Sequence, residues 1–293
     1  MKRKTFNGIL SSGAGSLWWG LIGVLYFKSV SFVSPLELTV HRTIWTSFIL
    51  IFFISIYSKW NLVFAVLKDF KKSLILLLTG MLIVTNWYTW IYAVTVNKLI
   101  DASFGYFIFP ILSVFFGIVF LKESHNKMKL ISISLVIISV IYLLLNFKTT
   151  PWIGLIVALT WSTYTLIRKK IKISTDIGLF IESTFIAPFA LIVFYFLVKD
   201  GANYFSTNDL AISFWLFLAG ANTLIPLALY LRGSELAGLG PSGMIFFLAP
   251  TGQFLLGFYY FNETLDLSKL ISFIIIWFAV AIYLRDLNNN DTN

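Results

Sequence analysis

Lys129-Leu130-Ile131-Ser132 recurs 140 positions later as Lys269-Leu270-Ile271-Ser272. The same offset, without any gap, places Gly80, Pro110, Gly117 and Glu123 on Gly220, Pro250, Gly257 and Glu263. Coincidences among Leu and Ile are common in apolar chains, but a shared offset for Gly, Pro and Glu is rare. The sequence therefore indicates two related halves. Where long apolar runs dominate, an internal repeat is typical of transporters, whose substrate site lies between the repeats.

The composition indicates a membrane protein. Of the 293 residues, 58% are hydrophobic and only 12% are charged, whereas soluble domains carry about 25% charged residues. The chain contains no cysteine, so disulfides and thiolate chemistry are excluded. The net charge of +9 comes from Lys and Arg residues between the apolar runs, where basic residues set orientation in the membrane. We therefore expect no nucleic-acid partner.

Ten apolar runs approach the length of about 20 residues that a helix needs to cross a bilayer. We place them at 8–27, 36–57, 73–96, 101–121, 129–146, 152–168, 177–198, 210–232, 240–261 and 268–285. The predicted fold is an all-α membrane protein with ten transmembrane helices. Five helices belong to a first repeat at 1–147 and five to a second repeat at 148–293. An odd number of spans in each half makes the second repeat inverted relative to the first.

The distribution of basic residues predicts the orientation. With a cytoplasmic N-terminus, sixteen of the 22 Lys and Arg residues fall on the cytoplasmic side and five on the other, and Arg42 lies within the membrane. This bias agrees with the positive-inside rule. We expect a multi-pass protein with both termini in the cytoplasm.

His41, Arg42 and Glu182 are ionisable residues at predicted membrane depth, where such side chains cost about 2.5–3.5 kcal/mol on insertion scales. Arg42 could offer its planar donors to a carboxylate or phosphate of a substrate, while His41 orients the substrate or takes a proton. The alternative is a structural bond between helices, for example from Arg42 to Glu37 or Asp101. Both interpretations carry equal weight.

Glu182 also has two interpretations. It could bind a proton in one state of a transport cycle and release it in another, which would make it a coupling or gating residue. Alternatively, it bridges to Arg168 or Lys169 at the end of the sixth predicted span.

Small residues and prolines open the fourth and ninth predicted spans in the same way. Asp101-Ala102-Ser103-Phe104-Gly105-Tyr106 is followed by Pro110, and Pro241-Ser242-Gly243-Met244 is followed by Pro250. This combination permits close helix approach and a kink. It predicts interrupted helices at equivalent places of the two halves, which would point to a central site.

Although Trp prefers membrane interfaces, many tryptophans lie within the predicted spans, among them Trp18, Trp19, Trp45, Trp87, Trp90 and Trp161. Trp87 follows Asn86 near the middle of the third span and shares a helix face with Trp90. With Trp19 and Tyr106, such aromatic residues could enclose a planar or cationic solute. The alternative for each tryptophan is packing or contact with lipid.

The sequence carries no signature of an enzyme, a metal centre or a cofactor. It has two histidines, no phosphate-binding loop and no Gly-x-Ser-x-Gly motif. We therefore expect no enzymatic activity, no catalytic residues, no cofactor and no metal. Transport would have to draw on a gradient.

The chain resembles the RarD branch of the EamA-type transporters in the drug/metabolite transporter superfamily. The segments that carry this resemblance are Trp19-Gly20, His41-Arg42 with Ile44-Trp45, Asn86-Trp87, Ala102-Ser103 with Gly105-Tyr106-Phe107 and Pro110, Arg168-Lys169-Lys170, Ile181-Glu182, and Pro188. The resemblance implies ten helices in two inverted repeats and transport of small metabolites or drugs across a bacterial inner membrane. Two positions depart from the branch, which typically has Glu at Asp101 and Asn at Phe109.

These observations predict a secondary transporter that moves a small organic solute by alternating access, either proton-coupled or facilitative. An amino acid, a zwitterionic metabolite or a drug-like compound would fit the predicted site. The expected substrate contacts are Trp19, His41, Arg42, Asn86, Trp87, Asp101 and Tyr106, and the expected coupling or gating residues are Glu182, Pro110 and Pro250. The alternatives are a lipid scramblase, flippase or lipid-linked enzyme, and a non-catalytic assembly partner. Membrane lipid and protons are candidate partners, and the chain could act as a monomer or homodimer.

Overall fold

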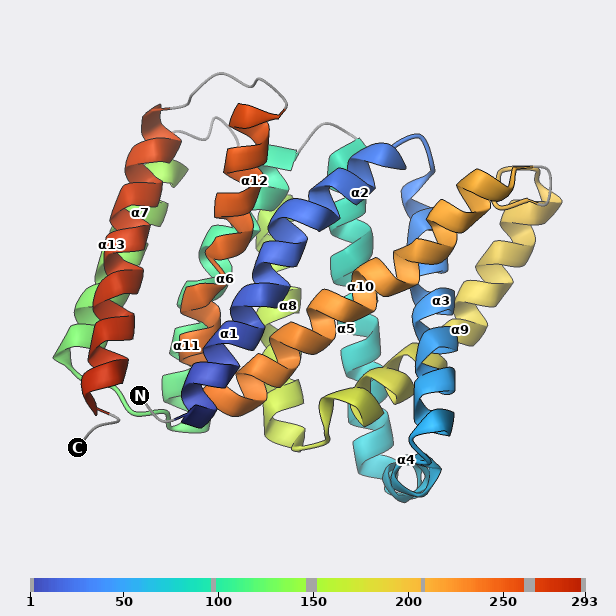
Figure 1. Ribbon diagram of the computed structural model, residues 1–293, viewed down its shortest axis with the longest axis horizontal. Helices are drawn as coiled ribbons and strands as arrows, with labels where there is room; N and C mark the ends of the chain where they lie inside the picture. The colour runs from blue at the N-terminus through green and yellow to red at the C-terminus, as the bar shows by residue number, and fades with distance from the viewer. Residues whose placement is uncertain (1–2, 96–98, 146–151, 207–208, 261–266, 291–293) are drawn as a thin grey trace.

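The computed structural model describes residues 3–95, 99–145, 152–206, 209–260 and 267–290, and every regular element in these ranges is helical (Figure 1). Eight helical stretches in the described chain are long and apolar enough to cross a membrane. The expected all-α membrane class is confirmed to that extent. Two expected spans fall outside this count: the fourth, whose side chains are described only from Gly105, and the sixth, which ends in three basic residues.

The helices follow the apolar runs with shifted ends. In chain order they are α1 (Arg3–Trp18), η1 (Trp19–Gly23), α2 (Val24–Ser29), α3 (Pro35–Ile56), α4 (Trp60–Leu67), α5 (Phe70–Thr95), α6 (Leu99–Leu121), α7 (Lys127–Leu144), α8 (Trp152–Ile171), α9 (Thr175–Lys199), α10 (Leu210–Ala237), α11 (Leu239–Ile245), α12 (Leu248–Tyr259) and α13 (Leu267–Asn290). Each long helix satisfies its own backbone groups, as hydrocarbon surroundings require.

Local sequence explains where several helices begin and change. The Ser34 hydroxyl accepts the amide of Glu37 at 3.2 Å and Pro35 occupies the first turn of α3. The first span is continuous from Arg3 to Ser29 but contains one π-helical turn, η1. α4 was not predicted from the sequence, because its eight residues are too few to cross a membrane.

The ninth span is interrupted, and the fourth is not. α11 and α12 are separated at Phe246 and Phe247, where the Ala249 amide reaches back three residues to the Phe246 carbonyl at 2.9 Å. Pro250 has no N–H to supply the normal bond to that carbonyl, which explains the tight turn. α6, in contrast, continues through Pro110. The expected interruption of the fourth span is therefore wrong.

Figure 1 shows how these helices are arranged. α7 packs against α13 at one end of the molecule, and α3 packs against α9 at the other end, where α4 lies across the base of the bundle. α1 and α10 cross each other in contact, and α8 contacts both α5 and α6. The first described turn of α1 and the last of α13 lie at the same end of the bundle. α1 runs away from this end, whereas α8 runs toward it.

Residues related by the 140-residue offset meet in the middle of the bundle. Tyr106 on α6 lies against Phe246, with ring centroids 5.6 Å apart, and Phe107 lies against Phe247 at 6.4 Å. α6 also packs against α11 and α12. Two pairs of positions that the offset relates are therefore neighbours in the structure.

Candidate functional site

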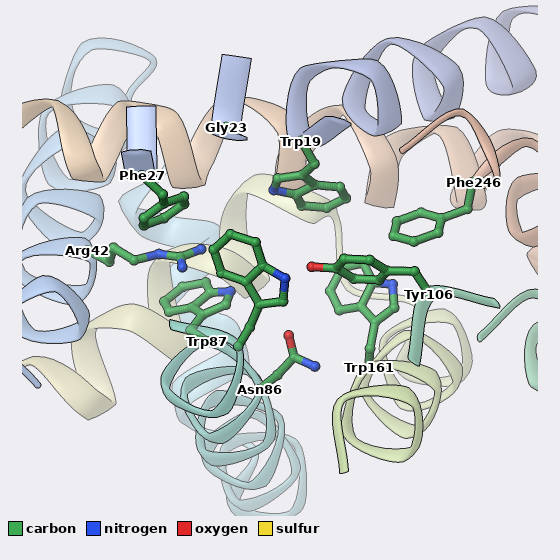
Figure 2. Close-up of a pocket in the computed structure, with 10 residues that line it drawn as sticks. Trp19, Gly23, Phe27, Arg42, Asn86, Trp87, Tyr106, Trp161 and Phe246 are labelled. Atoms are coloured by element: carbon green, nitrogen blue, oxygen red, sulfur yellow. The ribbon is translucent and has the colours of Figure 1, made fainter. Parts of the chain in front are cut away.

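The structure contains a cavity among the first, second, third, fourth, sixth and ninth spans, with about 530 Å³ of empty space when its opening is included. The described residues that line the cavity are Trp19, Gly23, Phe27, Arg42, Asn86, Trp87, Trp90, Tyr106, Trp161 and Phe246 (Figure 2).

The cavity lies in the half of the bundle remote from the described chain ends. Phe27 is two residues from the end of α2, Arg42 is seven residues from the start of α3, and Trp90 is five residues from the end of α5. All three helix ends lie on the side opposite the chain ends (Figure 1). At 1.5 Å per residue, Arg42 lies about 10 Å below that side.

Arg42 supplies the cationic group of the cavity. Its side chain is only 5% exposed, and its Nε donates to Thr223 Oγ1 on α10 at 2.8 Å. The guanidinium carbon lies 4.7 Å from the centre of the Trp87 ring and 5.0 Å from that of Phe27. Figure 2 shows the guanidinium between these two rings and directed toward the cavity. Within the described residues, no carboxylate forms an ion pair with it.

Hydrogen-bond donors dominate the polar groups of the lining. The indole Nε1 atoms of Trp90 and Trp161 are buried and have no hydrogen-bond partner in the described chain. The hydroxyl of Tyr106 points toward the centre of the cavity (Figure 2). Asn86 uses its Nδ2 to donate to the Val157 carbonyl at 2.9 Å.

Aromatic side chains form the wall opposite Arg42. Trp161 packs edge-to-face with Trp19, with ring centroids 5.4 Å apart. Phe109 contacts Trp161 at 5.8 Å and Phe246 at 4.8 Å and is fully buried behind the lining. Phe109 occupies the position where the resembling branch typically has Asn, and here it belongs to this apolar cluster.

The structure brings together five of the seven predicted substrate contacts: Trp19, Arg42, Asn86, Trp87 and Tyr106. His41 does not line the cavity. Successive residues of a helix point about 100° apart, and on α3 Arg42 faces the cavity whereas His41 is not part of its lining. His41 instead lies against the rings of Phe194 and Phe205, at 5.3 and 5.1 Å. Substrate binding by the five residues at the cavity stays a prediction.

The remaining predicted residues lie elsewhere. Asp101 falls in α6, but its side chain lies outside the described residues. Pro110 lies within α6, and Pro250 lies in the first turn of α12, beside the break in the ninth span. A gating role for either proline stays a prediction.

Glu182 lies in a separate buried cluster between α5, α8 and α9. Its carboxylate pairs with Arg168 Nε at 3.3 Å and accepts the hydroxyls of Thr79 at 2.6 Å and Tyr164 at 3.1 Å. These contacts agree with the predicted bridge to Arg168. A coupling role for Glu182 stays a prediction.

Sequence reasoning did not single out Gly23, Phe27, Trp90, Trp161 and Phe246 as contacts. For two of these residues, a pattern in the sequence could have predicted the contact. Trp90 shares the face of Trp87, and Phe246 is the residue that the 140-position offset places on Tyr106. For Trp161, nothing in the sequence indicates which side of its helix faces the cavity.

Comparisons with known proteins identify the family. The EamA-like transporter family matches residues 6–145. The chain is 31% identical over 284 residues to Protein RarD of Salmonella typhi, covering 97% of this chain and 96% of that protein. It is 32% identical to an uncharacterized transporter of Vibrio cholerae, covering 96% and 92% of the two chains. It is 31% identical to the uncharacterized transporter YojE of Bacillus subtilis, covering 96% and 94%. The chain is therefore a membrane transporter that belongs to the RarD branch of the EamA-like family, in the drug/metabolite transporter superfamily.

Proposed function

We propose that the chain is a secondary transporter in a bacterial inner membrane, and that the cavity binds a small organic solute with a negatively charged group. The observation that carries this proposal is the Arg42 guanidinium, which is buried at the cavity without an acidic partner in the described chain. A buried charge is costly unless it is paired. A carboxylate of the solute would pair with it, because the planar guanidinium matches that group with two parallel hydrogen bonds.

The other polar groups of the cavity favour the same class of solute. The free N–H groups of Trp90 and Trp161 and the hydroxyl of Tyr106 can donate to oxygens of a bound molecule. The aromatic wall suits an apolar or aromatic body. An amino acid, a zwitterionic metabolite or an anionic drug-like compound has both features. A solute with only cationic groups could contact the aromatic rings, but Arg42 would repel it and these donors would find no acceptor on it.

We further propose ten transmembrane helices in two inverted repeats, 1–147 and 148–293. The contacts between Tyr106 and Phe246 and between Phe107 and Phe247 support an axis between the two copies. The helix pairs support it too, because the contact of α1 with α10 has its counterpart in the contact of α8 with α5. The family match to residues 6–145 covers nearly all of the first proposed repeat.

Alternating access would follow from this arrangement. With both termini in the cytoplasm, as the basic residues predict, the cavity lies in the outer half. The cytoplasmic side is tied by Glu123, which accepts the amides of Leu239 and Gly240 at 2.7 and 3.0 Å. Lys169 also donates to carbonyls at the end of α10, including that of Glu235 at 3.0 Å. Opening toward the cytoplasm would require these bonds to break.

The cavity gives less support to lipid movement. A scramblase or lipid-linked enzyme would be expected to offer headgroups a lateral opening lined by several basic residues. Among the described residues that line the cavity, Arg42 is the single basic one. We therefore retain the transporter of soluble solutes as the proposal.

A ligand screen by thermal stabilisation of the purified protein tests this function. Matched pairs of carboxylates and amines with the same apolar body would be compared. We expect the carboxylates and zwitterions to raise the melting temperature and the amines to leave it unchanged. Each hit would then be tested for uptake into liposomes, with and without a pH gradient. Stabilisation by the amines alone, or binding without flux, would contradict the proposal.

A further inference from the structure

A second group of buried ionisable residues lies on α3, on the side turned away from the cavity. Glu37 is 0% exposed and His41, one turn further along, is 2% exposed. His41 Nε2 lies 3.6 Å from Glu37 Oε1. Neither residue lines the cavity.

Glu37 ties α3 to the segment 201–206, which follows α9. Its Oε1 accepts the backbone amide of Tyr204 at 2.7 Å and that of Phe205 at 3.2 Å. Its Oε2 is buried and has no hydrogen-bond partner in the described chain. One carboxylate oxygen is thus well bonded, whereas the other carries buried charge without a donor. Such a position is costly for an ionised group.

His41 accepts a hydrogen bond from a residue one turn further along α3. The indole Nε1 of Trp45 donates to His41 Nδ1 at 3.2 Å. Because an indole N–H can only donate, Nδ1 must hold a lone pair, and the hydrogen of the neutral imidazole lies on Nε2. Nε2 has no hydrogen-bond partner in the described chain and lies on the Glu37 side. A second proton on His41 would abolish the bond from Trp45.

Aromatic rings surround the pair. Phe194 from α9, Phe205 from segment 201–206 and Trp45 from α3 contact the imidazole. Tyr204, the titratable residue of that segment, packs its ring against Phe32. α5, α9 and α10 pack against α3. The basic residues of these three helices are Lys71, Lys72, Lys199 and Arg232, and in the described chain none of them forms an ion pair with Glu37. The acidic residues on these helices or at their N-caps are Asp176, Glu182, Asp209 and Glu235, and in the same described chain none of them contacts His41 as an ion pair.

We propose that Glu37 is a proton-binding site of the transporter, separate from the solute cavity, and that His41 positions it. A proton from the outer aqueous phase binds Oε2 and converts the carboxylate into a neutral acid. Uptake of the proton removes the buried charge. It also weakens the two bonds from the amides of Tyr204 and Phe205, because a neutral oxygen accepts hydrogen bonds less strongly than a charged one.

The protonated form would loosen segment 201–206 and thereby α10, whose Ser213 is bonded to Ser206 in that segment at 2.6 Å. α10 also carries Thr223, the hydrogen-bond partner of Arg42. A proton on Glu37 would thus act on the solute cavity through α10 and Arg42. This inference rests on the proposed function, since coupling requires a transported solute.

Infrared difference spectroscopy of the purified protein in liposomes tests proton binding without any solute. The probe is the proton itself, supplied by changing from mildly alkaline to mildly acidic buffer. We expect the wild-type protein to gain the carbonyl band of a carboxylic acid, and Glu37→Gln to lose this band. Asp200→Asn removes an exposed acid at the same end of the molecule and should keep it. If Glu37→Gln does not fold, Glu37→Asp should shift the band. An unchanged band in the Glu37 variant would overturn the proposal.

Uptake into liposomes tests the coupling. For a solute found by the stabilisation screen, wild-type protein and Asp200→Asn should transport faster with a pH gradient than without it. Glu37→Gln, which mimics the protonated acid, should transport the solute at the same rate under both conditions. A wild-type response to the gradient in Glu37→Gln would overturn the proton site while leaving the proposed function intact. A solute that binds without being transported by wild-type protein would instead refute the proposed function.

Discussion

Replacing Arg42 with Met should separate solute binding from stability. Met keeps much of the length of the side chain but removes the charge and the donors that face the cavity. Two charge-assisted hydrogen bonds to a carboxylate contribute about 1.5 kcal/mol each at the low end of their range. Their loss, about 3 kcal/mol, corresponds to a roughly 100-fold weaker affinity at 1.4 kcal/mol per tenfold change.

The stability of Arg42→Met should not fall in parallel. Arg42 is 5% exposed and lacks an acidic partner among the described residues, and a buried charge without a partner is costly, so its removal is a gain in stability. The lost hydrogen bond to Thr223 offsets about 1 kcal/mol of that gain. We therefore expect an unchanged or higher melting temperature of the unliganded protein.

Calorimetric titration and thermal melting of the same preparations provide the assay. Arg42→Lys serves as the matched variant, because it keeps the charge but loses the planar fork and its stacking on Trp87. We expect an intermediate loss of affinity, roughly tenfold by the energy scale above. Wild-type affinity in Arg42→Met would refute the assignment. Unfolding of Arg42→Met, together with normal binding by Arg42→Lys, would show that Arg42 is structural.

Three further predictions concern buried contacts. Glu182→Gln should destabilise the protein by about 3–5 kcal/mol, because it leaves the buried Arg168 without its charged partner. In melting experiments, the double variant Glu182→Leu/Arg168→Met should recover most of that loss, because it removes both charges. Gly233→Ala should lower stability by about 1–3 kcal/mol, because a Cβ there would lie only 2.5 Å from the Gly8 carbonyl on α1. An unchanged melting temperature would contradict the close contact between α1 and α10 at this position. Trp161→Phe removes an unpartnered indole N–H, so it should weaken solute binding. The smaller ring should also lower the melting temperature somewhat, because Trp161 is packed against Trp19 and Phe109. Loss of stability with wild-type solute affinity would contradict a role in binding.

The sequence was sufficient to predict most of the helices. Apolar runs of membrane length leave the backbone few alternatives to a helix, and the structure places helices over each predicted run. It was insufficient for α4, whose eight residues resemble a connection. The prediction for the fourth span was wrong. Pro250 accompanies a break in the ninth span, whereas the equivalent Pro110 lies within a continuous α6.

The site was predictable by residue type but less so by direction. Arg42 and His41 are both costly at membrane depth, and depth alone does not reveal which of two neighbours faces a cavity. The structure places Arg42 there and His41 beside Glu37. Phe246 could have been found from the repeat, since the 140-position offset relates it to Tyr106. The role of Glu37 could not, because its amide partners at Tyr204 and Phe205 are more than 160 residues away in the chain.

Access to the cavity from both sides of the membrane is the most direct test of the central claim. The chain has no cysteine, so Asn86→Cys would introduce a single thiol at the lining. A membrane-impermeant thiol reagent would be added to one side of oriented vesicles at a time. We predict labelling of the introduced thiol from the outside and, more slowly, from the cytoplasmic side, with protection by a bound solute in both cases. Labelling from one side alone under every condition would contradict alternating access through this cavity.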